Sequence, residues 1–505
     1  MTGPMRFEFR FARETPGTPA PRREHPTLRI LVLADLGGRA SRGEPAATPL
    51  ERRPVMAADP ETLGTVFTRC APRLRLRPGG ATGPEIEIAF ESLDDFHPDA
   101  LFERLGLFAA LRDTRRRLQS PDTFAAAAAE LGAAAGAPDR RGNGEAGGEA
   151  DAETIRRVLG REPGEGGRPS LEGRLRDDVR QVVRGIVAPY IVAAADPRQD
   201  PLVASVDQAI GGQMRAVLHH PSFQALEATW RSIERLMGDV ELGEEVQLHL
   251  LDATRDEIDS DLATAGTDLE RSGLHRLLVE GGQGPWSLVV ADYAFGPAEA
   301  EVKSLAALGA LASRMDGPLL AGARPELLGL RSLTGAPDAA DWPPLPAEAR
   351  QGWEALRASP WARWIGLALP RVLLRLPYGA RTDATERFAF EELDAGRDHE
   401  SYLWGNPAFT CAGLLAQSFV ESGWAMNPDD RRVQADLPAH AWREDGEPKL
   451  MPCAEVVLSA RAAGAMLRLG VIPFQSFADR NAVELARFQS LADPPAPLAG
   501  PWARA

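Results

Sequence analysis

The sequence predicts a mixed α/β (α+β) fold made of two units that a linker joins. Strand-like apolar runs alternate with helix-like amphipathic runs between residues 246 and 314, which favours an α/β core. Two alternating runs, at 71–77 and 85–90, flank a Pro-Gly-Gly turn and are typical of a hairpin. Residues 133–174 are rich in Gly, Ala and Glu, a composition that cannot bury enough apolar area to offset the entropy of ordering. We therefore expect two α/β units with a flexible connection.

These changes in composition set the expected boundaries. We expect the first unit at 1–132, the flexible linker at 133–174 and the second unit at 175–490. The end of the chain, 491–505, reads as a disordered tail. The two units should pack on each other as an intramolecular heterodimer, because the apolar face of a helix expected at 96–118 needs cover.

The length, composition and net charge of the chain limit the class of protein. The chain has 505 residues, of which 44% are hydrophobic and 26% charged, as in ordinary globular proteins. Its net charge of -15 argues against nucleic acid as the main partner. No apolar run approaches the roughly 20 residues of a membrane span, and the first residues do not resemble a signal peptide. We expect a cytoplasmic protein that does not insert into membranes.

The first unit begins with two strand signals. Residues 5–11 (MRFEFRF) alternate apolar and charged side chains, and such a strand must pair with its own chain or with a neighbour. We select Phe7, Phe9 and Phe11 from it as candidate interaction residues. The run 28–34 (LRILVLA) is apolar throughout, which predicts a buried strand.

The second unit is organised around residues 364–424. Its apolar run 365–369 predicts a buried strand, and a polar loop then leads to a helix. Asn406 is a good N-cap for this helix, and Trp404 should be buried beside it; we select both as candidate interaction residues. A further strand is expected at 454–459.

The sequence contains no convincing motif for catalysis, metal binding or nucleotide binding. The histidines have no second His or Cys at metal-ligand spacing, and no nucleophile-elbow, P-loop or zinc-protease motif is present. The loop 33–39 faintly resembles a phosphate loop but lacks the remaining glycines and a lysine. The carboxylate pair Glu391-Glu392 reads as part of a solvated loop, and the triplet 115–117 (three arginines) as a solvated helix face. We predict no catalytic residues, metal or cofactor.

Several longer strings nevertheless resemble one family, the contractile sheath proteins of type VI secretion systems. Strings in the second unit are similar to the large sheath subunit, in that family's order: 218–236, 290–297 (VADYAFGP), 364–383 and 402–409 (YLWGNPAF). Strings in the first unit are similar to the small sheath subunit: 28–39, 51–77 and 90–118.

The resemblance implies a structural, non-enzymatic role. In that family the two subunits are separate chains that form a heterodimer, which polymerises around an inner tube and is recycled by an AAA+ unfoldase. The resemblance therefore implies a fused small and large subunit whose partners are other sheath subunits and, further, inner-tube, baseplate and AAA+ unfoldase proteins.

The resemblance also leaves alternatives open. The family's large subunit continues beyond the segment that resembles the end of this chain, so its C-terminal extension is expected to be missing here. The chain is then either a sheath protomer or a specialised paralogue (a terminator, adaptor or regulator) that docks without propagating. An enzyme with a site in the loop 376–406 is the remaining alternative.

Overall fold

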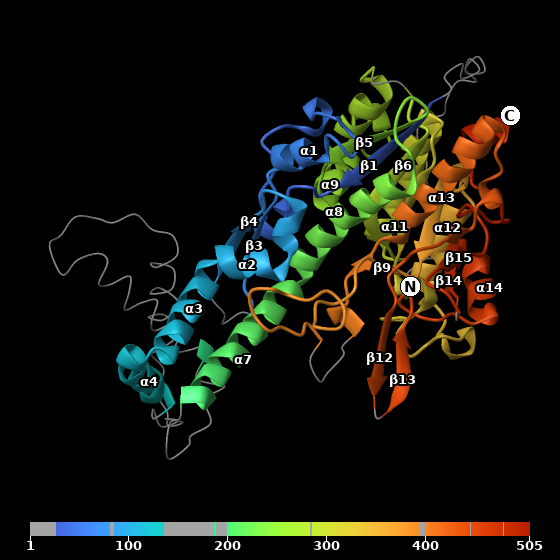
Figure 1. Ribbon diagram of the computed structural model, residues 1–505. Coiled ribbons are helices and arrows are strands. Elements are labelled where there is room, and N and C mark those ends of the chain that lie inside the picture. The colour runs from blue at the N-terminus through green and yellow to red at the C-terminus, as the bar shows by residue number, and fades with distance from the viewer. Residues whose placement is uncertain are drawn as a thin grey trace, which may run out of the picture. The chain divides into compact units, whose positions relative to one another are not determined.

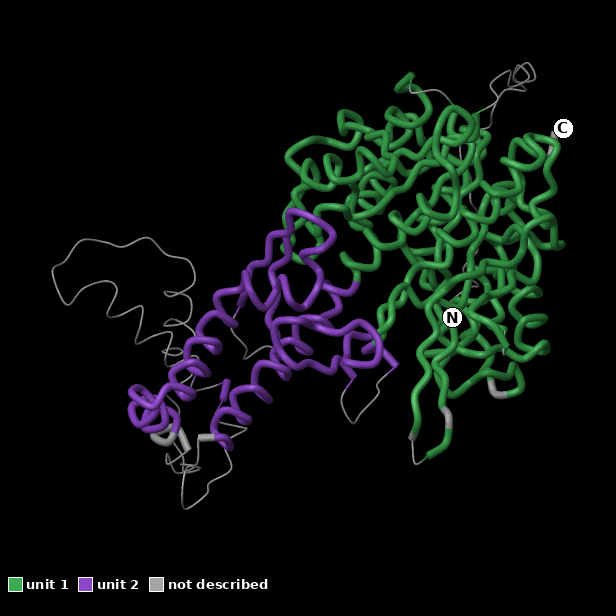
Figure 2. Tube along the Cα trace, in the orientation of Figure 1, with its two compact units in different colours: residues 1–72, 225–376, 402–505 green, residues 73–224, 377–401 purple. Residues whose placement is uncertain are grey.

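A computed structural model describes most of the chain and shows two compact units (Figure 1, Figure 2). Unit 1 comprises residues 1–72, 225–376 and 402–505, and unit 2 comprises 73–224 and 377–401. The described residues are 27–80, 85–135, 183, 186–187, 199–282, 285–393, 399–444, 446–477 and 479–504. The strand expected at 5–11, and the expected linker from residue 136 onward, lie outside them.

Unit 1 is built on a nine-stranded sheet with the order β11-β15-β14-β8-β7-β6-β1-β5-β2. The six strands from β14 to β5 are parallel to their neighbours, whereas β2, β15 and β11 pair antiparallel at the two ends of the sheet. The strands are β1 (Leu28–Ala34), β2 (Met56–Ala58), β5 (Val246–Asp252), β6 (Leu288–Phe295), β7 (Leu319–Ala323), β8 (Ile365–Leu369), β11 (Val433–Gln434), β14 (Val471–Ser476) and β15 (Val483–Leu485).

Strand β1 lies inside this sheet, between β5 and β6. Leu28 is opposite Val246 of β5, and Ile30 is opposite Leu288 of β6. A central parallel strand is covered on both faces, which explains why its sequence is apolar throughout rather than alternating. The sequence predicted the strand, but its neighbours come from a segment more than 200 residues away.

Helices cover both faces of the sheet (Figure 1). One face packs its apolar side chains with those of α9, α11, α12 and α14 in a single core, while α13 contacts β6, β7, β8 and β1. The helices of unit 1 are α1 (Leu63–Cys70), α9 (Arg255–Ala265), α10 (Gly273–His275), α11 (Glu299–Met315), α12 (Ala347–Arg357), α13 (Pro407–Ser422) and α14 (Ala460–Arg468). Two small antiparallel pairs complete it, β9 (Val372–Leu373) with β10 (Trp404–Gly405) and β12 (His440–Glu444) with β13 (Glu447–Met451).

Unit 2 is mainly helical. It contains the hairpin of β3 (Arg73–Leu76) and β4 (Ile86–Ala89), which the sequence predicted, and the helices α2 (Pro98–Arg104), α3 (Gly106–Gln119), α4 (Pro121–Ala135) and α7 (Gln199–Leu218). Helix α8 (Pro221–Asp239) begins in unit 2 and continues into unit 1. Phe90, Phe96 and Phe223 pack together, with the first two rings stacked at 4.3 Å.

The structure corrects two expectations about local elements. The helix expected at 96–118 is interrupted at Leu105, where the backbone is extended, and its second part, α3, packs against α7. Residues 454–459 form no strand, and the strand that joins the sheet is β14, after α14. The compact units do not follow the order of the sequence, because β1 and β2 belong to the sheet of unit 1, and the expected division at the linker stays a prediction.

The segment 491–505 was expected to be a disordered tail, but its described residues pack on the rest of unit 1. The backbone N–H of Leu491 donates to the carbonyl of Ile365 at 2.9 Å, and that of Ala499 donates to Arg363 at 2.8 Å. Leu491, Leu498 and Trp502 are buried. A few well-spaced apolar side chains hold this Pro-rich segment, which has almost no regular hydrogen bonding of its own. No helix among the described residues is long and apolar enough to cross a membrane.

Candidate functional site

The predicted interaction residues divide into two groups. Phe7, Phe9 and Phe11 lie outside the described residues. Trp404 is buried in unit 1 and Asn406 is half-buried, and the expectation that Trp404 is buried and that Asn406 caps the helix is confirmed. Their role in contacts with other chains stays a prediction.

Asn406 connects the start of α13 to the sheet. Its side-chain oxygen accepts the backbone N–H of Ala408 at 3.0 Å, as an N-cap should. Its side-chain nitrogen donates to the carbonyls of Ala291 and Tyr293 in β6, at 3.3 and 3.2 Å. Both ends of the amide are therefore used, which explains why the chain needs Asn here rather than another capping residue.

The loop between Tyr378 and Trp404 uses its carboxylates internally. Glu392 is buried and accepts the backbone N–H of Tyr378 at 2.8 Å, and Glu391 accepts that of Ala380 at 3.1 Å. These contacts hold the turn at 378–383 in place. The pair Glu391-Glu392, expected to be solvated, therefore supports the loop, and Glu392 also lies 3.6 Å from Nε2 of His219.

A group of charged and polar contacts lies at the joint where the chain leaves β1 and meets the end of β5. Asp252, at the end of β5, accepts the backbone N–H groups of Leu36 and Gly37 at 2.9 and 3.2 Å. This is the loop whose sequence faintly resembles a phosphate loop. Its amides do bind an anion, but the anion is a carboxylate of the same chain.

Two arginines complete this joint. Arg39 donates through Nε to Asp252 Oδ2 at 3.2 Å and pairs through Nη1 with Glu257. Arg53 donates to both oxygens of Glu257, at 2.8 Å each, and to the carbonyl of Asp252 at 2.9 Å. Both guanidinium groups are largely buried and committed to these acceptors. We call Arg39, Arg53, Asp252 and Glu257 the charged joint.

The electrostatics of Glu257 follow from this arrangement. Burial by itself would raise the pKa of Glu257, but the hydrogen bonds from Arg53 and Arg39 outweigh it and hold the pKa well below its usual range. Glu257 also accepts the backbone N–H of Thr254 at 2.8 Å, in a capping box at the start of α9. It is therefore a permanent anion that fixes a helix start and two arginines.

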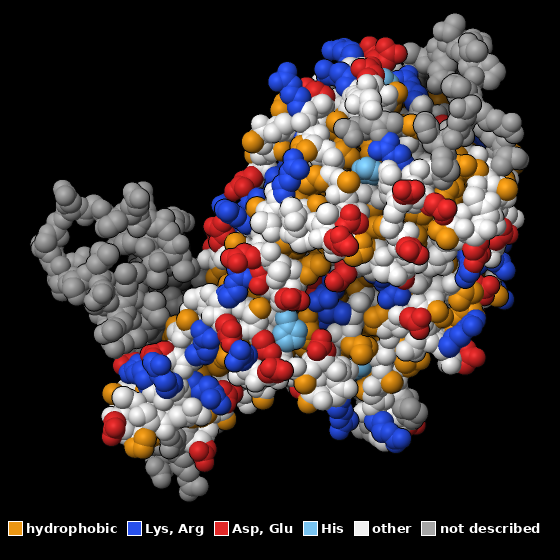
Figure 3. Space-filling view, turned by 45° about the horizontal axis from the view of Figure 1, so that its top comes forward, with side chains coloured by type: hydrophobic (Ala, Val, Ile, Leu, Met, Phe, Trp, Pro, Cys, Tyr) orange, Lys and Arg blue, Asp and Glu red, His pale blue; other side chains and the backbone are white. Residues whose placement is uncertain are grey.

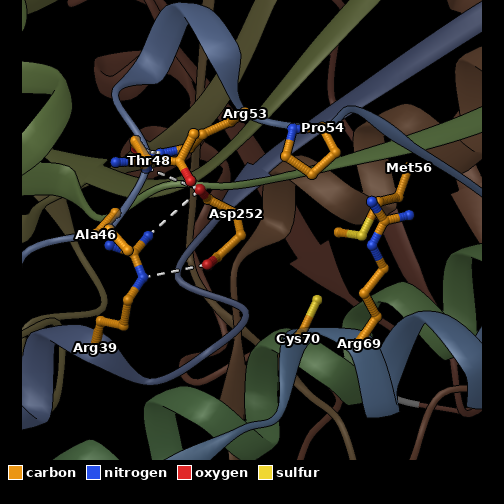
Figure 4. Close-up of a pocket in the computed structure, with 10 residues that line it drawn as sticks. Arg39, Ala46, Thr48, Arg53, Pro54, Met56, Arg69, Cys70 and Asp252 are labelled. Atoms are coloured by element: carbon orange, nitrogen blue, oxygen red, sulfur yellow. Dashed lines mark hydrogen bonds and ion pairs between the residues drawn. The ribbon is translucent and has the colours of Figure 1, made fainter.

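A cavity of about 240 Å³ opens beside the charged joint (Figure 4). Arg39 and Arg53 point at Asp252 from one side, and Cys70, Arg69 and Met56 lie across from them. Burial, reinforced by the Asp252 charge, raises the pKa of Cys70 to about 12, so its thiol stays protonated and is a poor nucleophile at neutral pH. Within the described ranges, no group of His, Cys, Asp and Glu could hold a metal ion. The arrangement suits a structural connection better than chemistry on a substrate.

Sequence reasoning did not select the charged joint. The Thr-x-x-Glu pattern at 254–257 is a local signal for a capping box and could have drawn attention to Glu257. Nothing local connects Arg53 or Arg39 with it, because more than 200 residues separate them along the chain.

Two family models match this chain. The model described as "Type VI secretion system, VipA, VC_A0107 or Hcp2" matches residues 6–130. The model of VipB, described as "EvpB/VC_A0108, tail sheath N-terminal domain", matches residues 200–492, which is more than half of the chain. The first match contains β1 and both arginines of the charged joint, and the second contains β5, β6 and both carboxylates.

The chain is also similar to the type VI secretion system sheath protein TssC1 of Pseudomonas aeruginosa. The two are 31% identical over 308 residues, which cover 58% of this chain and 61% of that relative. The chain thus matches less than two thirds of the relative's length. Taken with the two family models, this similarity shows that the chain belongs to the family of type VI secretion tail sheath proteins, with sequences of the small and the large sheath type in one polypeptide.

Proposed function

We propose that this protein is a structural, non-enzymatic component of a type VI-like contractile sheath. Its small-subunit-like part (1–132) and its large-subunit-like part (175–490) would act as one preassembled heterodimer, with 133–174 as the connection. The observation that carries the proposal is the position of β1. This strand comes from the part that matches the VipA model, yet it lies between β5 and β6, which belong to the part that matches the VipB model.

The position of β1 supports a permanent union of the two parts. Its register with β5 runs over seven residue pairs, from Leu28 opposite Val246 to Ala34 opposite Asp252, and β6 pairs with its other edge. Removing a central strand would leave two unpaired edges in an apolar sheet. Fusion in one chain keeps the parts at 1:1 stoichiometry and at high effective concentration.

The proposal includes the partners and the place of action. The protein would assemble in the cytoplasm with other sheath subunits, and through them with inner-tube, baseplate and AAA+ unfoldase proteins. The alternating sequence at 5–11 would add to a sheet edge of a neighbouring subunit by main-chain hydrogen bonds, with Phe7, Phe9 and Phe11 as its apolar side chains. Trp404 and Asn406 would contribute indirectly, by holding the start of α13.

Electron microscopy of the full-length protein, alone and mixed with complete small and large sheath subunits, tests the proposal. We expect the protein to form sheath-like tubes or to bind to those of the complete subunits. Long regular tubes from the pure protein would identify a protomer, and attachment at tube ends alone would identify a specialised paralogue. A protein that neither forms tubes nor binds them would refute a sheath role.

A matched pair of variants tests the contribution of residues 5–11. Phe7→Ser, Phe9→Ser and Phe11→Ser together should abolish assembly. Arg6→Ser, Glu8→Ser and Arg10→Ser together change the intervening positions and should preserve it. Equal assembly by the two triple variants would argue against strand addition through these phenylalanines.

A further inference from the structure

Unit 2 contains a second pocket, distinct from the charged joint and lined by four arginines. Its volume is about 270 Å³, and its walls come from α2, α3, α7 and the loop after Arg387. The residues that line it are Phe102, Arg112, Arg115, Arg116, Gln119, Asp207, Ile210, Arg387, Phe388 and Ala389. Figure 3 shows blue side chains gathered on the surface around α3. We call it the arginine pocket.

The aromatic part of the pocket is rigid. Phe102 and Phe388 stack with their ring centroids 4.4 Å apart and their planes 22° from parallel. The loop that carries Phe388 is fixed by Asp99 of α2, whose carboxylate accepts the backbone N–H groups of Glu386 and Arg387 at 2.8 and 3.0 Å. The pocket therefore offers a preformed apolar surface beside its cations.

The four arginines differ in how firmly they are held. Arg115 donates to both oxygens of Asp207 on α7, so it joins two helices. Arg116 and Arg387 make surface ion pairs with Asp113 and Glu103, and their side chains are 79% and 58% exposed. Exposed pairs of this kind contribute little, so these two guanidinium groups can turn to another anion at small cost.

Arg112 is the decisive residue. Its guanidinium lies 5.1 Å from the centre of the Phe102 ring and donates to the carbonyl of Glu103 at 3.0 Å. Among the described residues it makes no ion pair with a carboxylate. A half-buried cation that stacks on a ring and has no anionic partner, next to two exchangeable arginines, is an arrangement that suits a carboxylate ligand with an aliphatic stem.

We propose that the arginine pocket binds an acidic peptide segment of a partner protein. Carboxylate side chains of that segment would pair with Arg112, Arg116 and Arg387, and their methylene groups would pack on Phe102 and Phe388. The volume is below the range of about 300–1,000 Å³ typical of small-molecule sites, which fits side chains anchored from outside the pocket.

The charges around the pocket favour a peptide over nucleic acid. Three carboxylates, Asp113, Glu103 and Asp207, alternate with the arginines and would repel a continuous phosphate backbone. A peptide carboxylate can instead replace Glu103 or Asp113 as the partner of an arginine.

Fluorescence anisotropy with the full-length protein and a fluorescein-labelled hexaglutamate peptide tests this inference. We expect binding at low ionic strength that added salt weakens, and no binding of a labelled hexaglutamine peptide. Arg112→Gln with Arg387→Gln should weaken hexaglutamate binding at least about ten-fold, the effect of losing one hydrogen bond to a charged group.

The control removes the same charge elsewhere. Arg350 and Arg461 in unit 1 also make exposed ion pairs, and Arg350→Gln with Arg461→Gln should leave binding unchanged. If Arg112→Gln disturbs folding, Arg116→Gln with Arg387→Gln repeats the test on two exposed side chains. Absence of hexaglutamate binding would overturn the proposal. Weakening of that binding by the Arg350 and Arg461 control variant, to the same extent as by the pocket variants, would overturn it too. So would tighter binding of a thymidine oligonucleotide with the same arginine dependence, which would identify a phosphate site.

Discussion

Arg53 donates to both carboxylate oxygens of Glu257, at 2.8 Å each, although 204 residues separate them in the sequence. Arg53 lies in the part of the chain that matches the small sheath subunit, and Glu257 lies in the part that matches the large one. The pair is therefore a charged contact between the small-subunit-like and the large-subunit-like parts of this chain. Arg53 also donates to the carbonyl of Asp252, which is opposite the last residue of β1, and the pair is mostly buried.

Replacing Glu257 should weaken this contact strongly. Glu257→Gln leaves Arg53 and Arg39 without their shared anion while preserving the shape of the side chain. Because removing one partner of a buried pair leaves an uncompensated charge, we expect a loss of about 3 kcal/mol in the free energy of unfolding. Urea denaturation followed by circular dichroism measures it. Glu354→Gln, at an exposed pair with Arg350, should cost less than about 1 kcal/mol, and an equal loss there would contradict this account.

The stability should depend on pH through His249. This residue lies in β5, 5.1 Å from the Trp286 ring and 3.4 Å from an Arg29 nitrogen. Burial, with the Arg29 charge, lowers the pKa of His249 from 6.5 to about 4. Between these values the unfolded chain binds a proton that the folded chain does not, so stability is full above pH 6.5 and falls as the pH falls towards 4.

The His249 contribution can be isolated by a variant. From about pH 7 to about pH 5 the protein should lose about 2 kcal/mol through this residue. Over the same interval, the His249→Leu protein should lose about 2 kcal/mol less than the unchanged protein, because leucine binds no proton. This difference does not depend on how stable the variant is at neutral pH. Parallel pH profiles of the two proteins, measured by urea denaturation, would show that His249 does not titrate in this window.

Asn406 offers a test that separates its two roles. Asn406→Asp keeps an oxygen for the N-cap but loses the donor to Ala291 and Tyr293, and Asn406→Ala loses both functions. We expect Asn406→Ala to cost about 1 kcal/mol for the cap and about 1 kcal/mol more for the unsatisfied carbonyls. Asn406→Asp should also destabilise at neutral pH, since the new carboxylate lies near buried Asp292, whose pKa burial already raises. A fully stable Asn406→Asp protein would show that the amide donor is unimportant.

Trp404 should be a large contributor to stability rather than a surface contact. Its side chain is buried, packs beside Tyr402 and belongs to β10, which pairs with β9. Trp404→Ala should cost about 3–5 kcal/mol, as large truncations in cores do. Val457→Ala, at a position that is 57% exposed, is the control and should change the thermal midpoint little. Normal stability of Trp404→Ala would point to a role in contacts with other chains.

Separating the two parts should show that they fold together. Fragments 1–132 and 175–505, produced in the same cell as separate chains, should co-purify. Strand β1 of the first fragment pairs with β5 on one edge and with β6 on the other, and both of these strands belong to the second fragment. Val32→Pro in the first fragment should abolish co-purification, since proline removes a hydrogen-bond donor from a central strand. Two independently folded, monomeric fragments would disprove the intramolecular heterodimer.

The sequence by itself determined the family and several of the local elements. The apolar run at 28–34, the strand at 365–369 and the capped helix after Asn406 were all predicted, because side-chain periodicity and capping residues act over a few positions. The strings shared with sheath subunits likewise needed no coordinates. These signals were enough to propose a structural role, although they gave no reason to pair Glu257 with Arg53.

Only the tertiary structure decided which distant segments meet. It placed β1 between β5 and β6, paired Arg53 with Glu257, and buried Trp502 in a segment whose composition suggested disorder. It also placed Arg387 and Arg112 in the lining of one pocket. The arginines at 115–117 were expected to be a solvated helix face, but Arg115 and Arg116 line the same pocket. The physical reason is the same in each case. Burial and charge pairing depend on the sum of contacts from remote parts of the chain, and a local pattern contains no information about those partners.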